Sequence, residues 1–192
     1  MAVSLLDLWL PILLSGLACY MISAICWMVL PHHKPEWSGL PDEDALMALL
    51  SEQKAGRGHY SFPHCSSNEQ MRDPEFSKKW TDGPSGFLIV QGPENKSMGK
   101  NMAMSFSYNL AVAVVVAYLA TIGLEAGAAG TDVFRMTATA TFLGCWAAHV
   151  PNAIWFSFTW SSAFKQAIDA LLYALATGGI FVAFWPDGLI GG

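Results

Sequence analysis

Polar side chains recur at helical spacing inside three apolar stretches of this sequence. The third stretch carries Thr137, Thr141, Cys145, His149 and Asn152, at intervals of three or four residues. The last stretch carries Lys165, Asp169, Tyr173 and Thr177, and the first carries Ser15, Cys19, Ser23 and Cys26. Residues three and four apart lie on one face of a helix, so each set forms a polar stripe.

These stripes are open to two interpretations. Small and hydroxyl side chains let membrane helices approach closely and hydrogen bond across their interface, which is a structural role. Ionisable groups inside a membrane are costly and usually functional, so His149 and Asp169 would instead mark a proton, ion or cofactor site. A haem is disfavoured, because a second axial histidine inside an apolar stretch is missing.

The chain reversal near Trp160 allows the third and fourth stretches to be aligned as antiparallel helices. In that register Asp169 lies level with Asn152, and His149 lies level with Tyr173. We therefore expect one polar seam between the two helices. Its residues are His149, Asn152, Asp169, Tyr173, Thr141 and Cys145.

Histidine and cysteine also occur outside the long apolar stretches. The weak candidates for metal ligands are His32, His33, His59, His64 and Cys65. Imidazole and thiolate together suit soft metals, but no HxxxH or CxxC spacing supports a site. Gly92 and Gly99-Lys100 have the wrong spacing for a phosphate loop. The sequence therefore predicts no catalytic residue, no metal and no cofactor.

The polar stripes lie in stretches that are long enough to cross a membrane. A spanning helix needs about 20 apolar residues, and backbone groups in lipid must be bonded within the helix. We expect an all-α membrane protein with four transmembrane helices, at residues 5–30, 101–124, 133–158 and 166–185. Residues 1–30 form the first helix, 31–100 a polar loop subdomain, and 101–192 the other three helices.

Charge is concentrated between residues 34 and 100, which hold eight of the ten Lys and Arg and ten of the fifteen Asp and Glu. This mixture of signs gives no basic stripe, so nucleic acid is excluded as a partner. Basic residues near the helix ends are Lys34, Lys96, Lys100 and Lys165 on one side and Arg135 on the other. Their asymmetry predicts a cytoplasmic loop and periplasmic termini, with lipid as the surrounding partner.

The polar loop has the local signals of an ordered unit. Residues 41–56 read as a short amphipathic helix, with acidic residues at its N-terminus and Lys54 and Gly56 at its end. Asp73 is placed to cap a second short helix, with Pro74 in its first turn. Residues 60–62 and 87–90 are β-prone runs that could pair as a hairpin. The loop also contains aromatic candidates for partner binding, which are Tyr60, Phe62, Phe76, Trp80 and Phe87. We expect these to be buried together in a small subdomain on the membrane surface.

Four strings of residues resemble a family of uncharacterised bacterial integral membrane proteins. They are Leu40-Pro-Asp-Glu-Asp-Ala45, Tyr60-Ser-Phe-Pro-His-Cys65, Gly83-Pro-Ser-Gly-Phe87 and Met98-Gly-Lys-Asn101, and the tail from Asp169 to Pro186 fits the same pattern. The resemblance covers most of the chain. It implies bacterial origin and four spans, but no known activity.

Two function classes follow from the sequence. The first is a non-catalytic membrane subunit that packs against or stabilises a larger inner-membrane complex, such as an energy-transducing one. The alternative is a small transporter, or a membrane-embedded protein that binds an ion or small molecule at the polar seam. An enzyme is the least favoured class, because no catalytic motif is present.

Overall fold

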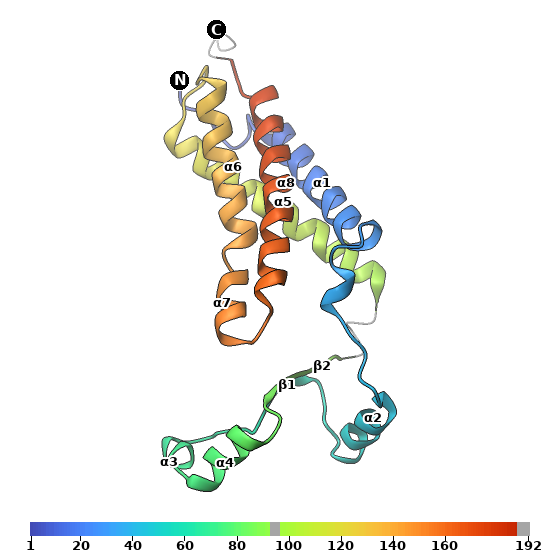
Figure 1. Cartoon of the computed structure of the whole chain (residues 1–192). Helices are drawn as coiled ribbons and strands as arrows, with labels where there is room; N and C mark the ends of the chain where they lie inside the picture. The colour runs from blue at the N-terminus through green and yellow to red at the C-terminus, as the bar shows by residue number, and fades with distance from the viewer. Residues whose placement is uncertain (93–96, 188–192) are drawn as a thin grey trace. The chain divides into compact units, whose positions relative to one another are not determined.

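The computed structural model describes residues 1–92 and 97–187 and divides the chain into two compact units (Figure 1). The first unit is helical and comprises Met1–Trp37 and Gly99–Gly192. The second comprises Ser38–Met98. The candidate site described below lies wholly within the first unit.

Three helices of the first unit are long and apolar enough to cross a membrane. The first candidate span covers Trp9–Val29, which joins α1 (Trp9–Ala24) to a π-helical turn (Ile25–Val29). The others are α5 (Met98–Gly123) and α8 (Trp160–Ala183). The chain is thus mostly helical, as the sequence predicts.

The single third helix predicted for residues 133–158 is wrong. The structure has instead α6 (Gly130–Trp146) and the short α7 (His149–Trp155), with a break between them. Pro151 lacks the N–H that would bond the carbonyl of Ala147, and its ring clashes with that carbonyl. Neither segment qualifies by itself as a candidate span.

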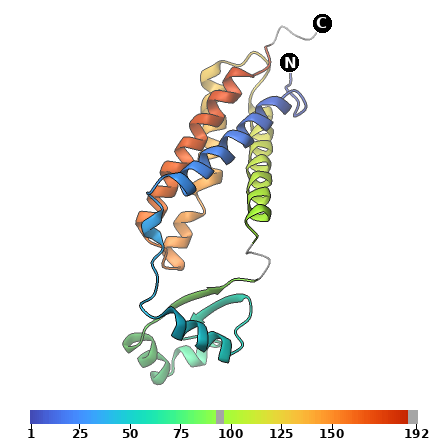
Figure 2. The same ribbon diagram turned by 90° about the vertical axis from the view of Figure 1, so that its right-hand side faces the viewer.

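The helix α8 is the centre of the first unit, with α1 along one side and α6 along another (Figures 1 and 2). Both neighbours run antiparallel to α8. The helix α5 joins the same core through its small and β-branched residues, Ala113, Val116, Ala117 and Ala120. These residues pack with Leu8, Val133 and Phe181, which are fully buried.

The link between α5 and α6 holds the first and last described segments of the chain at one end of the helical unit. Ala126 N–H donates to the carbonyl of Met1 at 2.9 Å, and Gly127 N–H donates to the carbonyl of Pro186 at 2.9 Å. The indole of Trp185 donates to the carbonyl of Glu125 at 3.0 Å. The lower ends of α1 and α8 in Figure 1 lie at the opposite end of this unit.

In its described residues, 38–92 and 97–98, the second unit contains a two-stranded antiparallel sheet and three short helices. Strands β1 (Gly58–Phe62) and β2 (Gly86–Val90) pair, with Tyr60 opposite Leu88. They are not joined as a hairpin, because α3 (Asn68–Met71) and α4 (Pro74–Asp82) lie between them in the chain. Before the sheet comes α2 (Glu43–Glu52).

The helix caps in the second unit follow from the sequence. The side chain of Asp42 accepts a hydrogen bond from the backbone N–H of Ala45 at 3.0 Å, and Asp73 accepts from the N–H of Glu75 at 2.9 Å. A carboxylate at the N-cap satisfies a backbone donor that the helix leaves unpaired. The cap at Asp73 is the one that the sequence predicts, whereas for α2 the sequence predicts only acidic residues at the start of the helix.

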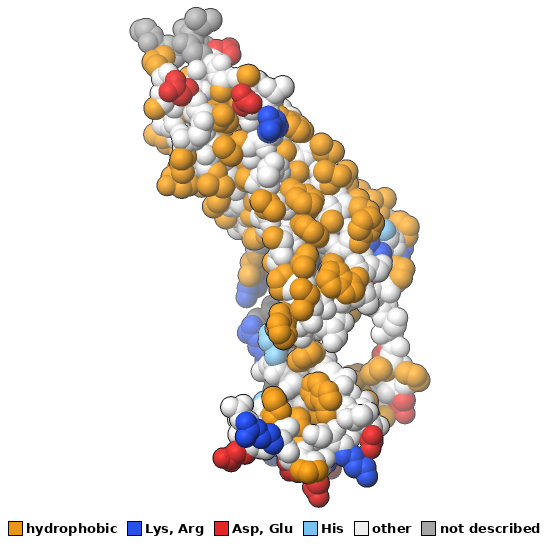
Figure 3. All heavy atoms as spheres, turned by 60° about the vertical axis from the view of Figure 1, so that its left-hand side comes forward, with side chains coloured by type: hydrophobic (Ala, Val, Ile, Leu, Met, Phe, Trp, Pro, Cys, Tyr) orange, Lys and Arg blue, Asp and Glu red, His pale blue; other side chains and the backbone are white. Residues whose placement is uncertain are grey.

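Aromatic residues of the second unit remain accessible, contrary to the expectation that they are buried together. Tyr60, Phe62, Trp80 and Phe87 are all exposed, and only Phe76 is half-buried. A unit of this size with two strands and short helices has too little interior to cover five rings. In the view of Figure 3, hydrophobic side chains cover most of the helical unit, whereas charges gather on the second unit.

Close packing between α6 and α8 depends on Gly178. A Cβ at this position would lie 2.7 Å from a ring carbon of Phe134 and 3.2 Å from the Cβ of Ala138. The next residue, Gly179, has open space at the corresponding point. Gly178 is therefore a test position for this packing, and Gly179 on the same helix is its control.

We expect Gly178→Ala to destabilise the helical unit by about 1–3 kcal/mol, because the added methyl overpacks a tight interface. Gly179→Ala should instead be neutral or stabilising by up to about 1 kcal/mol, since alanine favours helix. Thermal unfolding of the purified protein in detergent or nanodiscs measures both. Equal effects of the two substitutions would contradict the α6–α8 packing described here.

Candidate functional site

The polar stripes of α1 and α8 face each other along the antiparallel pair. The thiol of Cys19 lies 3.4 Å from the hydroxyl of Thr177, and Ser23 and Tyr173 are the polar residues one turn further along the two helices. One turn further along, Cys26 reaches Asp169. The stripe on α8 therefore meets α1, whereas the sequence register predicts a seam with the third helix.

The π-helical turn Ile25–Val29 ends α1 and leads into Pro31, where the chain leaves the helix. The N–H of Leu30 bonds the carbonyl of Ile25 at 2.9 Å, which is the wider hydrogen-bond pattern of a π turn. The chain then forms a short 3-10 turn at Lys34–Glu36. This turn returns His32, His33 and Glu36 to the side of α8.

Asp169 is the centre of the site, with a side chain that is only 1% exposed. One carboxylate oxygen lies 3.0 Å from Nε2 of His32, and the other lies 2.8 Å from Nε2 of His33. An ionised carboxylate only accepts hydrogen bonds, so both rings donate to it. Both oxygens of a buried charge are thus satisfied, which is the condition for keeping such a charge inside a protein.

His33 bridges two carboxylates. Its Nδ1 lies 2.7 Å from Oε1 of Glu36, while its Nε2 bonds Asp169. The ring is 2% exposed and stacks on the indole of Trp27, with centroids 4.0 Å apart and an interplanar angle of 4°. Trp27 thus covers one face of the ring, and the two carboxylates fix its rotation.

Glu36 connects this centre to the first turns of α8. The hydroxyl of Ser162 donates to Oε2 of Glu36 at 2.7 Å, and Nζ of Lys165 lies 3.4 Å from Oε1. Burial opposes ionisation of Glu36, but the hydrogen bond from Ser162, the hydrogen bond and charge of His33 and the hydrogen bond from Lys165 outweigh it and lower the pKa of this carboxyl. Glu36 is therefore ionised at neutral pH.

Hydrogen counting defines the charge of the cluster. Three nitrogen–oxygen contacts join His32 and His33 to the two carboxylates, and each contact needs one hydrogen. Two neutral imidazoles supply only two, so the contacts require one additional proton. With that proton and the charge of Lys165, the two carboxylates are balanced and the cluster is neutral.

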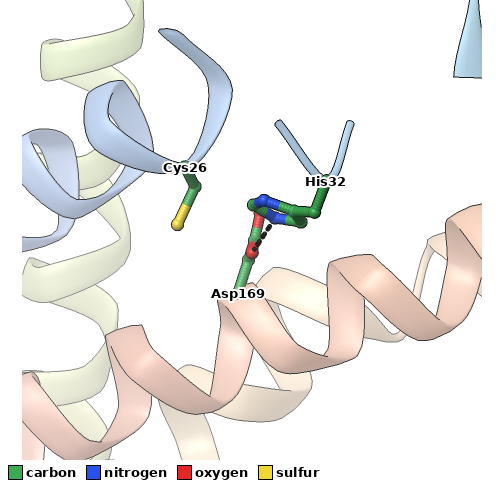
Figure 4. A group of neighbouring side chains, drawn as sticks. All are labelled: Cys26, His32 and Asp169. Atoms are coloured by element: carbon green, nitrogen blue, oxygen red, sulfur yellow. Dashed lines mark hydrogen bonds and ion pairs between the residues drawn. The ribbon is translucent and has the colours of Figure 1, made fainter. Parts of the chain in front are cut away.

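Cys26 extends the site toward soft ligands. Its thiol is buried, and its sulfur, a ring nitrogen of His32 and a carboxylate oxygen of Asp169 lie within 4.8 Å of one another (Figure 4). Among the residues that the structure describes, this is the one group of three such side chains placed closely enough to hold a metal. The side chain of His32 is 28% exposed, so the group is accessible on that side.

Other predicted site residues lie elsewhere. His149 begins α7 and Asn152 follows one turn later, both half-buried, and the Asn152 carbonyl accepts from the N–H of Phe156. Thr141 donates to the carbonyl of Thr137 within α6 at 2.8 Å, and Cys145 is half-buried near the end of that helix. The break before α7 ends the continuous register on which the pairing of Asp169 with Asn152 was predicted.

The remaining metal candidates belong to the second unit. His64 Nδ1 lies 3.1 Å from the hydroxyl of Ser61, and the thiol of Cys65 bonds the carbonyl of Ser67 at 3.2 Å. His59 is an exposed residue of β1. The structure thus brings His32 and His33 to Asp169, and leaves these three in another unit.

Sequence reasoning missed the roles of Cys26, Glu36, Lys165 and Ser162 at this site. Two signals were available. The stripes of the first and last apolar stretches have matching four-residue intervals, and His32-His33-Lys34-Pro35-Glu36 directly follows the first stretch. Comparison with protein families, curated proteins and solved structures finds no match for this chain. The family resemblance therefore rests on its sequence strings alone.

Proposed function

We propose that this chain is an integral membrane protein that binds a cation at the cluster of Asp169, His32, His33 and Glu36. The observation that carries the proposal is the placement of Asp169. This carboxylate is almost fully buried within an apolar helix long enough to cross a membrane. Intramembrane ionisable groups are expensive, and those retained usually serve an ion, a proton or a substrate.

A purely structural role would need fewer polar and charged side chains than this cluster contains. A single hydrogen-bonding pair could hold α1 against α8, and Cys19 with Thr177 already forms one. The cluster adds two imidazoles, two carboxylates and an ammonium group in one place. A cation bound by His32 and Asp169 would take the place of the hydrogen between them and add positive charge beside the two carboxylates.

Stabilisation by added cations tests this proposal. A ligand that binds only the folded state raises its stability, by about 2.7 kcal/mol at 100 times its Kd. We expect at least one of Na⁺, K⁺, Mg²⁺, Ca²⁺, Mn²⁺ or Zn²⁺ to raise the Tm of the protein in nanodiscs by several degrees. The effect should persist in Asp132→Asn, an exposed carboxylate on α6, and be lost in Asp169→Asn.

Asp169→Asn is the suitable substitution, because the amide keeps a hydrogen-bonding group of the same size while removing the charge. Asp169→Leu would leave two imidazoles without their hydrogen-bond acceptor. Each buried donor left in this way lowers the stability of the fold by about 1–3 kcal/mol. A wild-type protein that no cation stabilises would refute the cation site. So would equal stabilisation of wild type and Asp169→Asn.

We propose further that the chain crosses a bacterial inner membrane four times, with α6 and α7 together forming the additional crossing. The segment Gly130–Trp155 leaves the end of the unit at which Ala126 bonds Met1. It ends where α8 begins, at the end of the unit where Ser162 donates to Glu36. A helix broken in mid-membrane is tolerated where neighbouring protein covers the freed backbone groups.

The four crossings place the second unit in the cytoplasm and both termini in the periplasm. Lys34, Lys100 and Lys165 favour this orientation over Arg135; Lys96 adds to the same side in sequence but lies outside the described residues. Reporter fusions near Gly56 and at Gly192 should give opposite signals, with the second one periplasmic. Identical signals would contradict the fourth crossing, and reversed signals only the orientation.

A second candidate function is a non-catalytic subunit of a larger inner-membrane complex. The exposed rings of Tyr60, Phe62, Trp80 and Phe87 favour it, because accessible aromatic residues often anchor protein interfaces. Within the candidate spans only 28–33% of residues are buried inside the chain, which leaves apolar faces for lipid or other subunits. Co-purification from native membranes tests it: a stoichiometric partner supports a subunit, and a lone oligomer contradicts it.

A further inference from the structure

The proposed cation site has a thiol on one side. A sulfur ligand determines which class of cation the site prefers. Cys26 is a free cysteine, almost completely buried, and faces Asp169 from the π-helical turn at the end of α1. The spherical alkali and alkaline-earth ions prefer oxygen ligands, whereas thiolate and imidazole suit zinc and its neighbours. The donor set of Cys26, His32 and Asp169 is therefore of the transition-metal type.

We infer that this protein binds a divalent transition metal of the Zn²⁺ class through Cys26, His32 and Asp169; the inference rests on the proposed cation site and names its ligand. The three ligand atoms come from different parts of the chain, the π turn, the segment after it and the middle of α8. The metal would thus join the end of the first candidate span to the last one.

The distances between the three ligand atoms are close to those in a zinc site. Zinc bonds of about 2.0–2.3 Å in tetrahedral geometry place ligand atoms roughly 3.3–3.6 Å apart. Here the His32 and Asp169 atoms are 3.0 Å apart, and the three ligand atoms lie within 4.8 Å of one another. Cys26 binds as a thiolate and releases its proton to solvent, while the hydrogen on Nε2 of His32 moves to Nδ1.

His33 and Glu36 act on the metal through Asp169. His33 holds the second oxygen of that carboxylate at 2.8 Å and is itself fixed by Glu36 at 2.7 Å. Hydrogen bonds of this kind orient a ligating carboxylate and typically change metal affinity 10–100-fold. His33 and Glu36 are accordingly positioning residues. Three protein ligands leave the fourth position of a tetrahedral zinc open, on the accessible side of His32.

Cobalt provides a direct probe, because a cobalt–thiolate bond produces a charge-transfer absorption that oxygen and nitrogen ligands do not. The experiment uses the full chain in nanodiscs, carrying Cys65→Ser so that the partly exposed thiol of the second unit does not contribute. We expect one Co²⁺ per chain with a thiolate band, and loss of that band when one equivalent of Zn²⁺ is added. If the Cys65→Ser protein is folded and shows no such band, the inference is overturned. This outcome does not depend on whether any further variant folds.

Matched cysteine variants locate the ligand. Cys19→Ser replaces a thiol on the same helix that bonds Thr177, and should keep the band. Cys26→Ser should lose the band and lower Zn²⁺ affinity at least tenfold. A band that disappears in Cys19→Ser and survives in Cys26→Ser would overturn the assignment.

The two proposals fail in different ways. Stabilisation by Na⁺, K⁺, Mg²⁺ or Ca²⁺ that depends on Asp169, in a protein without a cobalt–thiolate band, would leave the cation site standing and refute the zinc-class ligand. Absence of stabilisation by every cation tested would refute both. His33→Gln offers a further check, because it should weaken Zn²⁺ binding 10–100-fold while retaining the band.

Discussion

The carboxylate of Asp169 imposes the strongest constraint on this structure. It lies in the middle of α8 with almost no exposure, in a helix whose other residues are largely apolar. A buried ionised carboxylate without partners is prohibitively costly, so the fold must deliver donors to both of its oxygens. The neighbouring helices cannot do this alone, because the facing positions of α1 offer thiols and hydroxyls rather than strong donors.

The donors come from the segment that follows α1. The π-helical turn changes the direction of the chain, Pro31 ends the helix, and the short turn at Lys34–Glu36 brings two imidazoles back to α8. Trp27 stacks on His33, and Glu36 takes the second nitrogen of that ring. The local irregularity at the end of α1 is therefore required by a charge on another helix. An ideal helix over residues 5–30 would not present His33 in this way.

Much of the helical framework could be predicted from the sequence. Which helix faces pack against each other could not. Apolar length identifies the three candidate spans, and Asp73 before Pro74 identifies the cap of α4. Hydrophobic pattern does not say which polar stripes face each other. The short connection before Trp160 makes α6 a neighbour of α8, and the structure has that contact, but α8 has more than one neighbour. Its polar face turns to α1, and the break between α6 and α7 interrupts the helix on which the other pairing depended.

The ionic cluster also explains why α1 and α8 pack in one register. Cys19 and Thr177 form one polar pair, and Ser23 and Tyr173 are the polar residues about one turn further along the two helices. A slip of one turn, about 5.4 Å, would still place a polar residue opposite each polar residue, with Cys19 facing Tyr173. These weak pairs therefore do not fix the alignment. The same slip would move Asp169 away from His32 and His33 and separate Glu36 from Ser162, leaving charges buried without partners. The cost of that state exceeds any gain from hydroxyl and thiol pairs, so the charged residues select the register that the small polar residues merely permit.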